Sequence, residues 1–147
     1  MTVVCQEPAD TARLGGLLAS RLKPGDVLVL SGELGCGKTL FTGGVAMGLG
    51  VDEPVTSPSF VLVRRYRSGF IPLVHADVYR LRSKHEFEDL DLWGEPGVLV
   101  VEWGDVVVDF LPADHLRIDF EVADDSSRIV TFSPQGSWVD RLESEAI

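Results

Sequence analysis

The spacing of apolar residues along the chain predicts an alternation of helices and strands. Residues 27–30 and 98–101 are short, wholly apolar runs, a pattern typical of strands that are buried on both faces of a parallel sheet. Residues 8–22 instead carry leucines at helical spacing, and Pro8 suits the first turn of that helix. A second helix is expected to end near residue 49. The apolar positions of the two helices are Leu14, Leu17, Leu18 and Leu22, and Phe41, Val45 and Leu49.

Antiparallel hairpins are expected in the second half of the chain. Residues 60–67 and 70–76 are strand-like and are separated by the turn signal Ser68-Gly69. Residues 116–122 alternate apolar and charged side chains, so this strand should have one wet face. An acidic turn then leads into a partner strand at residues 128–133.

Two further helices should be short. One is expected around residues 85–90, in an acidic and irregular stretch. The other is C-terminal and carries Trp138 and Leu142. Ser137 and Asp140 are spaced as a capping box for this last helix.

The loop after the first buried strand carries the strongest chemical signal. Residues 32–39 read Gly-Glu-Leu-Gly-Cys-Gly-Lys-Thr, which fits G-x-x-x-x-G-K-[ST], the phosphate-binding P-loop. Strand, glycine loop and helix is the context that the motif requires. Lys38 is expected to reach the β- and γ-phosphates, and Thr39 to place its hydroxyl on Mg²⁺. Backbone N–H groups are expected to bind phosphate at Leu34, Gly35, Cys36 and Gly37.

Composition and motif together predict the fold class. A chain of 147 residues with 45% hydrophobic residues is expected to form one domain over residues 1–147. We predict an α/β, P-loop NTPase-like domain whose mixed sheet, parallel near the P-loop and antiparallel elsewhere, is flanked by helices. The apolar runs are too short to span a bilayer, so no membrane partner is expected. Two cysteines, Cys5 and Cys36, do not make a disulfide framework, which favours a cytoplasmic location.

The charge distribution limits the possible partners. A net charge of −10 argues against broad nonspecific nucleic-acid binding, which needs several basic contacts to phosphates. Six of the 13 basic residues nevertheless fall in one stretch. They can form a solvated face, bind an acidic partner, contact tRNA phosphates or include a phosphate-sensing arginine. The six are Arg64, Arg65, Arg67, Arg80, Arg82 and Lys84.

Two acids are placed to complete a P-loop site. Asp77 follows the apolar stretch that ends at Ala76, and Glu102 follows residues 98–101. Acids just past buried strands emerge at the edge of the sheet where α/β proteins hold ligands. Either can hold the metal through water or orient the attacking water, and either can instead cap the next turn. Hydroxyls in residues 56–60 can reach the same site, although a plain turn explains that segment equally well.

Four motifs together resemble one family. They are G-E-L-G-C-G-K-T-L-F-T at residues 32–42, T-S-P-S-F at 56–60, H-A-D-V-Y-R-L at 75–81 and V-E-W-G-D at 101–105. In order and spacing the chain resembles, up to about residue 120, the TsaE family (formerly YjeE), small bacterial ATPases of tRNA threonylcarbamoyladenosine synthesis. The P-loop occurs in many families, whereas the other three motifs in combination are specific.

The resemblance implies an ATPase that is weak alone and acts with a partner pair, TsaB and TsaD, on the adenosine beside the tRNA anticodon. The chain would then reach tRNA indirectly, through the complex. Lys38 matches the phosphate lysine and Thr39 the Mg²⁺ threonine, so ATP and Mg²⁺ are the implied cofactors. Asp77 matches an acid important for turnover, and Glu102 the metal-side acid. An adenine pocket near residues 7–11 is also implied.

Three other functions remain open on the residues alone. In a small-molecule P-loop kinase, Asp77 would be the base for a substrate hydroxyl. A GTPase commonly selects guanine with an Asn-Lys-x-Asp motif, and this chain contains no asparagine. A noncatalytic nucleotide-sensing scaffold would bind ATP without turnover under any condition.

Overall fold

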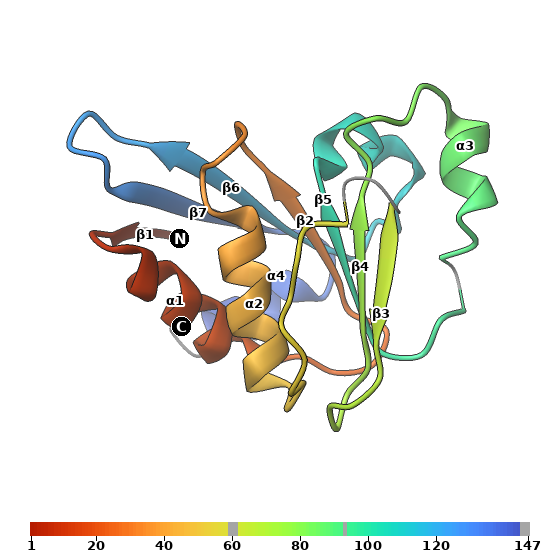
Figure 1. Ribbon diagram of the computed structural model, residues 1–147, viewed down its shortest axis with the longest axis horizontal. Helices are drawn as coiled ribbons and strands as arrows, with labels where there is room; N and C mark the ends of the chain where they lie inside the picture. Colours follow the sequence, from red (N-terminus) through yellow and green to blue (C-terminus); the bar gives the residue numbers. More distant parts are fainter. Residues whose placement is uncertain (59–61, 93, 145–147) are drawn as a thin grey trace.

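The computed structural model describes residues 1–58, 62–92 and 94–144, and within them the chain folds around one seven-stranded sheet (Figure 1). The strand order is β1-β7-β6-β2-β5-β4-β3. The four strands β6, β2, β5 and β4 pair in parallel, whereas β1–β7, β7–β6 and β4–β3 pair antiparallel. The predicted mixed α/β sheet is therefore confirmed. The strands are β1 (Thr2–Cys5), β2 (Val27–Ser31), β3 (Val63–Tyr66), β4 (Leu73–Asp77), β5 (Val98–Glu102), β6 (Leu116–Val122) and β7 (Arg128–Pro134).

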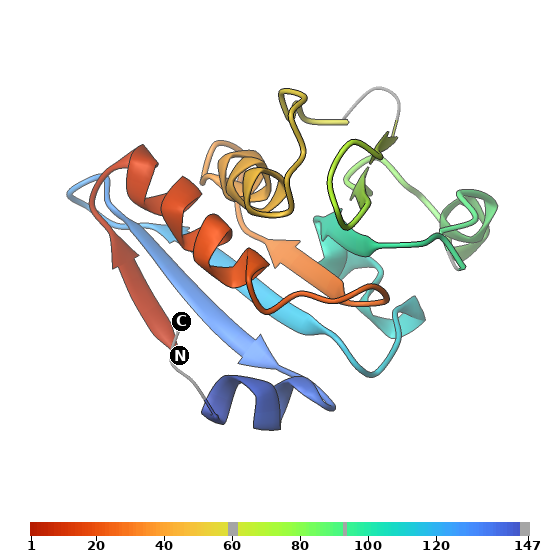
Figure 2. The same ribbon diagram turned by 90° about the horizontal axis from the view of Figure 1, so that it is seen from below.

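Helices cover both faces of the sheet. Figure 2 shows α1 (Pro8–Ala19) and α2 (Lys38–Gly48) side by side on one face. The hydrophobic core between them and the sheet contains alternate residues of the strands, such as Leu28 and Leu30 of β2. A second apolar cluster lies on the opposite face, where α3 (Lys84–Asp89) and two 3₁₀ turns (Gly104–Val106 and Val108–Phe110) cover β4 and β5. Strands β2 and β5 therefore have an apolar environment on both sides, as their unbroken apolar runs predict.

Close packing of α1 on α2 explains one of the two adjacent glycines in α2. A Cβ at Gly44 would lie 1.9 Å from the carbonyl oxygen of Ala12 in α1. A Cβ at Gly43 would meet nothing within 4 Å. Gly44 therefore lets two backbones approach, whereas Gly43 has no such packing reason.

This contrast predicts opposite effects for two neighbouring substitutions. Gly44→Ala is expected to lower the free energy of unfolding by about 1–3 kcal/mol, because backbone atoms of α1 must shift to make room. Gly43→Ala is expected to raise it by roughly 0.5–1 kcal/mol, because alanine loses less conformational entropy in a helix. Urea denaturation of both variants beside the unmodified chain measures the difference. Stabilisation by both would contradict the packing described for Gly44.

Several element boundaries differ from the predicted ones. Helix α1 ends at Ala19, and its predicted stripe is interrupted because Leu17 is 52% exposed. Strand β4 begins at Leu73, later than predicted. Strand β3 covers Val63–Tyr66, and the part of the prediction that falls on residues 59–61 lies outside the described residues. Strand β1 was not predicted at all. It pairs with β7, far away in the sequence, so no local turn signal marks it.

The predicted capping box of the C-terminal helix is wrong. Ser137 precedes α4 (Trp138–Glu143) with helical backbone angles, φ −64° and ψ −16°, and its side chain makes no capping hydrogen bond. Its hydroxyl instead donates to Asp114 at 2.9 Å. The helix is held by Arg141, which donates to Asp26 at 2.8 Å, and this bond raises the pKa of the arginine. A long-range acceptor has thus displaced the local capping pattern.

No helix in the described part of the chain is long and apolar enough to cross a membrane.

Candidate nucleotide-binding site

The P-loop connects the carboxyl end of β2 to the first residue of α2. Gly35 and Gly37 have φ values of +77° and +110°, in the left-handed region that favours glycine. Gly37 is also the residue that precedes α2, so the loop delivers the chain to the helix N-terminus, where backbone N–H groups attract anions. Glu33 is exposed to solvent, which suits an acid beside a phosphate site because like charges repel.

A cavity of about 720 Å³ lies over this loop, a size that suits a nucleotide. The predicted site residues Leu34, Gly35, Gly37, Lys38 and Thr39 line it. Asp77 and Glu102 line it as well, together with Ser57 and Trp103. The N-terminal segment closes one side of the cavity with Cys5, Gln6, Glu7, Pro8 and Thr11. Ser126 and Arg128 also line it, so the structure gathers residues from six separate parts of the sequence around one space.

Cys36 is the predicted loop residue that does not line the cavity. Its side chain is 1% exposed and lies beneath the loop. Its N–H donates to the carbonyl of Glu33 at 3.2 Å, so in this structure that group is engaged within the loop. The thiol accepts a hydrogen bond from the Nζ of Lys38 at 3.4 Å.

Lys38 is buried in the site with its ammonium group held by the loop itself. Nζ donates to the carbonyl oxygens of Gly32 at 2.6 Å and Glu33 at 2.9 Å. It also lies 4.1 Å from the centre of the Trp103 ring, a cation–π contact. These carbonyl contacts satisfy a cation that is only 5% exposed, and a phosphate group would have to replace some of them.

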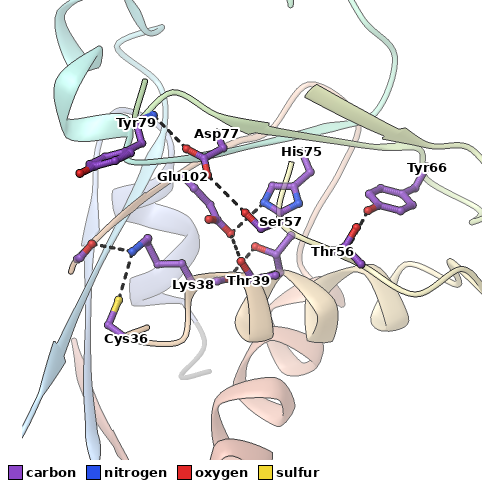
Figure 3. A network of polar contacts seen from close by, with 12 residues as sticks. Cys36, Lys38, Thr39, Thr56, Ser57, Tyr66, His75, Asp77, Tyr79 and Glu102 are labelled. Atoms are coloured by element: carbon purple, nitrogen blue, oxygen red, sulfur yellow. Dashed lines mark hydrogen bonds and ion pairs between the residues drawn. The ribbon is translucent and has the colours of Figure 1, made fainter. Parts of the chain in front are cut away.

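The two acids lie on neighbouring strands. Asp77 of β4 is directly opposite Glu102 of β5 in the parallel register, and both side chains are buried. The hydroxyl of Thr39 donates to Glu102 Oε1 at 2.9 Å, which joins the start of α2 to the end of β5. His75 Nε2 lies 3.0 Å from the same oxygen (Figure 3). Thr39 and Glu102, the two metal-side residues that the resemblance implies, are thus in direct contact.

Within the described part of the chain, Asp77 makes contacts of different kinds. Its Oδ1 accepts the N–H of Tyr79 at 3.0 Å, which is the turn-capping role that the sequence left open. Its Oδ2 accepts the hydroxyl of Ser57 at 3.5 Å, which connects it to the polar turn before β3. Of that turn, residues 59 and 60 lie outside the described residues. Asp77 therefore caps a turn and lines the cavity at the same time.

Sequence comparison decides the family. A family model described as threonylcarbamoyl adenosine biosynthesis protein TsaE matches residues 5–130. The chain belongs to the TsaE family. The matched region contains the P-loop, both acids and most of the sheet.

Individual relatives agree with this assignment over most of their length. A protein of Bacillus subtilis (strain 168), named tRNA threonylcarbamoyladenosine biosynthesis protein TsaE, is 41% identical over 94% of this chain and 88% of its own. A protein of the same name from Streptomyces coelicolor is 48% identical over 84% of this chain and 89% of its own. The crystal structure of Bacillus subtilis YdiB superposes with a TM-score of 0.83 at 36% identity, covering 98% of this chain and 91% of that one.

A residue from the far end of this TsaE chain reaches the P-loop, and sequence reasoning missed it. Arg128 of β7 donates from Nε to the carbonyl oxygen of Cys36 at 3.2 Å and from Nη2 to that of Gly35 at 3.4 Å. It also donates to the carbonyl of Ser126 and lines the cavity. Arg128 thus braces the outer side of the loop. Local sequence carries no signal for this contact, because the two segments are separated by more than 90 residues.

The chemistry of the donor set fits Mg²⁺ held together with a nucleotide. Among the residues that the structure describes, no group of three or more His, Cys, Asp or Glu side chains could hold a metal by itself. Mg²⁺ in nucleotide sites usually takes one or two carboxylates and completes its shell with phosphate oxygens and water. Thr39 and Glu102 supply a hydroxyl and a carboxylate at 2.9 Å from each other. They could therefore hold the ion only jointly with phosphate.

The cluster of basic residues lies away from the cavity. All six are described, and none of them lines it. Arg65 forms an ion pair with Glu95 at 2.6 Å, and Lys84 one with Glu88 at 3.4 Å. Arg64 lies in the edge strand β3 and Arg67 directly follows that strand, and both are exposed. A role as phosphate sensor of this cavity is thus disfavoured, whereas a solvated face, contact with an acidic partner and contact with tRNA phosphates remain open.

Proposed function

We propose that this chain binds Mg-ATP in the P-loop cavity and hydrolyses it slowly, in support of threonylcarbamoyl modification of the tRNA adenosine beside the anticodon. It would do so in the cytoplasm with the TsaB–TsaD pair and reach tRNA through that complex, residues 1–147 acting as one domain. Membership of the TsaE family supports the pathway. The observation that carries the ATPase is the convergence of Lys38, the Thr39–Glu102 pair and Asp77 on one cavity.

Lys38 and the start of α2 would bind the phosphates. The ammonium group exchanges its contacts with the Gly32 and Glu33 carbonyls for β- and γ-phosphate oxygens. Charge-assisted hydrogen bonds of this kind are about twice as strong as neutral ones. The N–H groups at the N-terminus of α2 add a fixed positive dipole where charge develops. Both groups thus favour the triphosphate over a neutral ligand.

Thr39, Glu102 and Asp77 would act at the γ-phosphate. Thr39 and Glu102 would hold Mg²⁺, and the ion would supply positive charge to offset the charge of the phosphates. Asp77 lines the same cavity and can accept a hydrogen bond from the attacking water, orienting it toward phosphorus. Hydrolysis by this arrangement requires positioning more than covalent chemistry, which is the usual case for phosphoryl transfer.

The open rim of the cavity explains why activity would be weak without partners. Leu34 of the P-loop is 88% exposed, and Tyr79 beside Asp77 is 60% exposed. Water reaches a site with such a rim, and water weakens the electrostatic interactions that stabilise the transition state. A protein that covers Leu34 and Tyr79 would exclude water and raise the rate. We propose that the TsaB–TsaD pair does this.

Multiple-turnover tRNA modification tests the proposal. TsaB and TsaD are given a donor of the threonylcarbamoyl group, excess unmodified tRNA and Mg-ATP, with and without this chain. The proposal predicts several modified tRNAs per TsaD only when the chain is present. Equal yields with and without the chain would count against a role in the cycle. Phosphate appearing on a small metabolite instead would favour the kinase alternative.

A further inference from the structure

His75 is buried next to Glu102, with one ring nitrogen bonded and the other without a partner among the described residues. The side chain is 0% exposed. Nε2 lies 3.0 Å from Glu102 Oε1, whereas Nδ1 is a buried polar atom with no hydrogen-bond partner among the described residues. A buried polar atom without a partner costs free energy that an apolar side chain would not. Packing alone therefore does not account for a histidine at this position.

His75 Nε2 and the Thr39 hydroxyl share one acceptor, Glu102 Oε1. A carboxylate oxygen only accepts hydrogen bonds, so Nε2 is the donor. The same Oε1 accepts a hydrogen bond from the hydroxyl of Thr39, with 2.9 Å between the two oxygens (Figure 3). With its proton directed to Glu102, the Thr39 oxygen keeps its lone pairs for a cation. The orientation of the hydroxyl thus depends on where Oε1 is held.

The strand register shows what would happen to Glu102 without this donor. Glu102 lies opposite Asp77 in the β4–β5 pair, and His75 lies opposite Val100. The bond from His75 to Glu102 therefore runs diagonally between the two strands. Two carboxylates on adjacent positions repel each other in a buried site. A donor two residues before Asp77 on the same face of β4 is placed to hold the Glu102 carboxylate against that repulsion.

We propose that His75 is a positioning residue: by donating Nε2–H to Glu102 Oε1, it holds Glu102 so that the Thr39 hydroxyl is presented to Mg²⁺. This inference rests on the proposed function, because it concerns the Mg²⁺ of the nucleotide complex. Partners that orient metal-binding side chains typically change metal affinity by about 10–100-fold when removed. Binding of nucleotide without metal should not depend on His75, since the P-loop amides and Lys38 make those contacts.

Three substitutions separate the donor from the bulk of the ring. In His75→Gln the amide nitrogen can occupy the position of Nε2, so the bond to Glu102 can form. In His75→Asn the amide nitrogen corresponds to Nδ1 and falls short of Glu102. His75→Leu fills the space without any donor and is expected to fold even if the asparagine variant does not. Thermal unfolding of each variant reports its structural effect separately.

The measurement is the affinity for a fluorescent ADP, titrated at a series of Mg²⁺ concentrations and in EDTA. We expect the Mg²⁺ concentration at half-effect to rise about 10-fold or more for His75→Asn and His75→Leu. His75→Gln should return it to within about 3-fold of the unmodified chain, and affinity in EDTA should be nearly the same in all four proteins. An unchanged Mg²⁺ midpoint in the asparagine or leucine variant would overturn the proposal. So would a midpoint in the glutamine variant as high as theirs.

A double-mutant comparison tests whether His75 acts through Glu102. In a Glu102→Ala background, His75→Leu should cause no further rise in the Mg²⁺ midpoint, because the group that it positions is gone. A further rise of the same size as in the unmodified background would show that His75 acts by another route. If ADP binding by the unmodified chain itself does not respond to Mg²⁺, the metal part of the proposed function fails, a result distinct from either outcome for His75.

Discussion

Replacing Lys38 with alanine is expected to weaken ATP binding by about 100-fold or more and to abolish hydrolysis. A hydrogen bond to a charged group contributes about 1.5–3 kcal/mol, so losing one to each of two phosphates removes about 3–6 kcal/mol of binding free energy. The substitution also removes the contacts of Nζ with the Gly32 and Glu33 carbonyls. Calorimetric titration with ATP and Mg²⁺ measures the affinity, and phosphate release measures turnover.

The matched control for Lys38→Ala is Lys84→Ala. Lys84 is exposed on α3, does not line the cavity and contacts Glu88 and the ring of Phe110 at the surface. Lys84→Ala removes one positive charge, as Lys38→Ala does, so any effect of net charge on ATP binding appears in both variants. Lys84→Ala should bind ATP as the unmodified chain does. Normal turnover by Lys38→Ala would sink the assignment of the P-loop as the ATP site.

Asp77→Asn is expected to reduce ATP hydrolysis by about 10²–10⁴-fold and to leave ATP affinity within about 3-fold. Asparagine keeps an oxygen that can accept the Tyr79 N–H, so the turn after β4 stays capped. It cannot act as the anionic acceptor for the attacking water. The substitution therefore separates the turn cap at Asp77 from its proposed role toward the attacking water. Single-turnover hydrolysis with excess protein measures the chemical step directly.

The matched control for Asp77→Asn is a change of the same charge outside the cavity. Asp109→Asn removes one negative charge at an exposed position on a 3₁₀ turn that does not line the cavity, and it should hydrolyse ATP normally. If Asp77→Asn is also normal while Asp77→Ala is unstable to heat, Asp77 is only a capping residue. Glu102 would then be the acid to test as the group that orients water.

The parts of the site that follow from local sequence were predictable. The P-loop, its strand and its helix are continuous in the chain, so periodicity and the glycine pattern place Lys38 and Thr39 together. Glu102 and Asp77 were predictable as strand-end residues because parallel strands bring their carboxyl ends to one edge. Their direct opposition in the register is a finding of the structure, since side-by-side pairing of β4 and β5 is a long-range choice.

The parts that depend on distant pairing were not predictable. Strand β1 is an edge strand with two exposed residues, so it lacks the wholly buried apolar run that marked β2 and β5, and its partner β7 is far along the chain. Arg128 reaches the P-loop only because β7 returns beside β6 and places the hairpin end over the cavity. The roles of His75 and Ser137 likewise depend on the atoms that face them after folding. A histidine in an apolar strand looks like a packing residue until Glu102 is placed beside it.

Phosphate release from Mg-ATP, measured with this chain alone and with TsaB and TsaD, tests the account most directly. The account predicts slow release by the chain alone and marked stimulation by the pair, with no release in either condition by Lys38→Ala. Stimulation shows that partners complete the site, and its loss in the variant shows that the P-loop of this chain does the hydrolysis. ATP binding without any release, alone or with the pair, would contradict the account and favour a nucleotide-sensing scaffold.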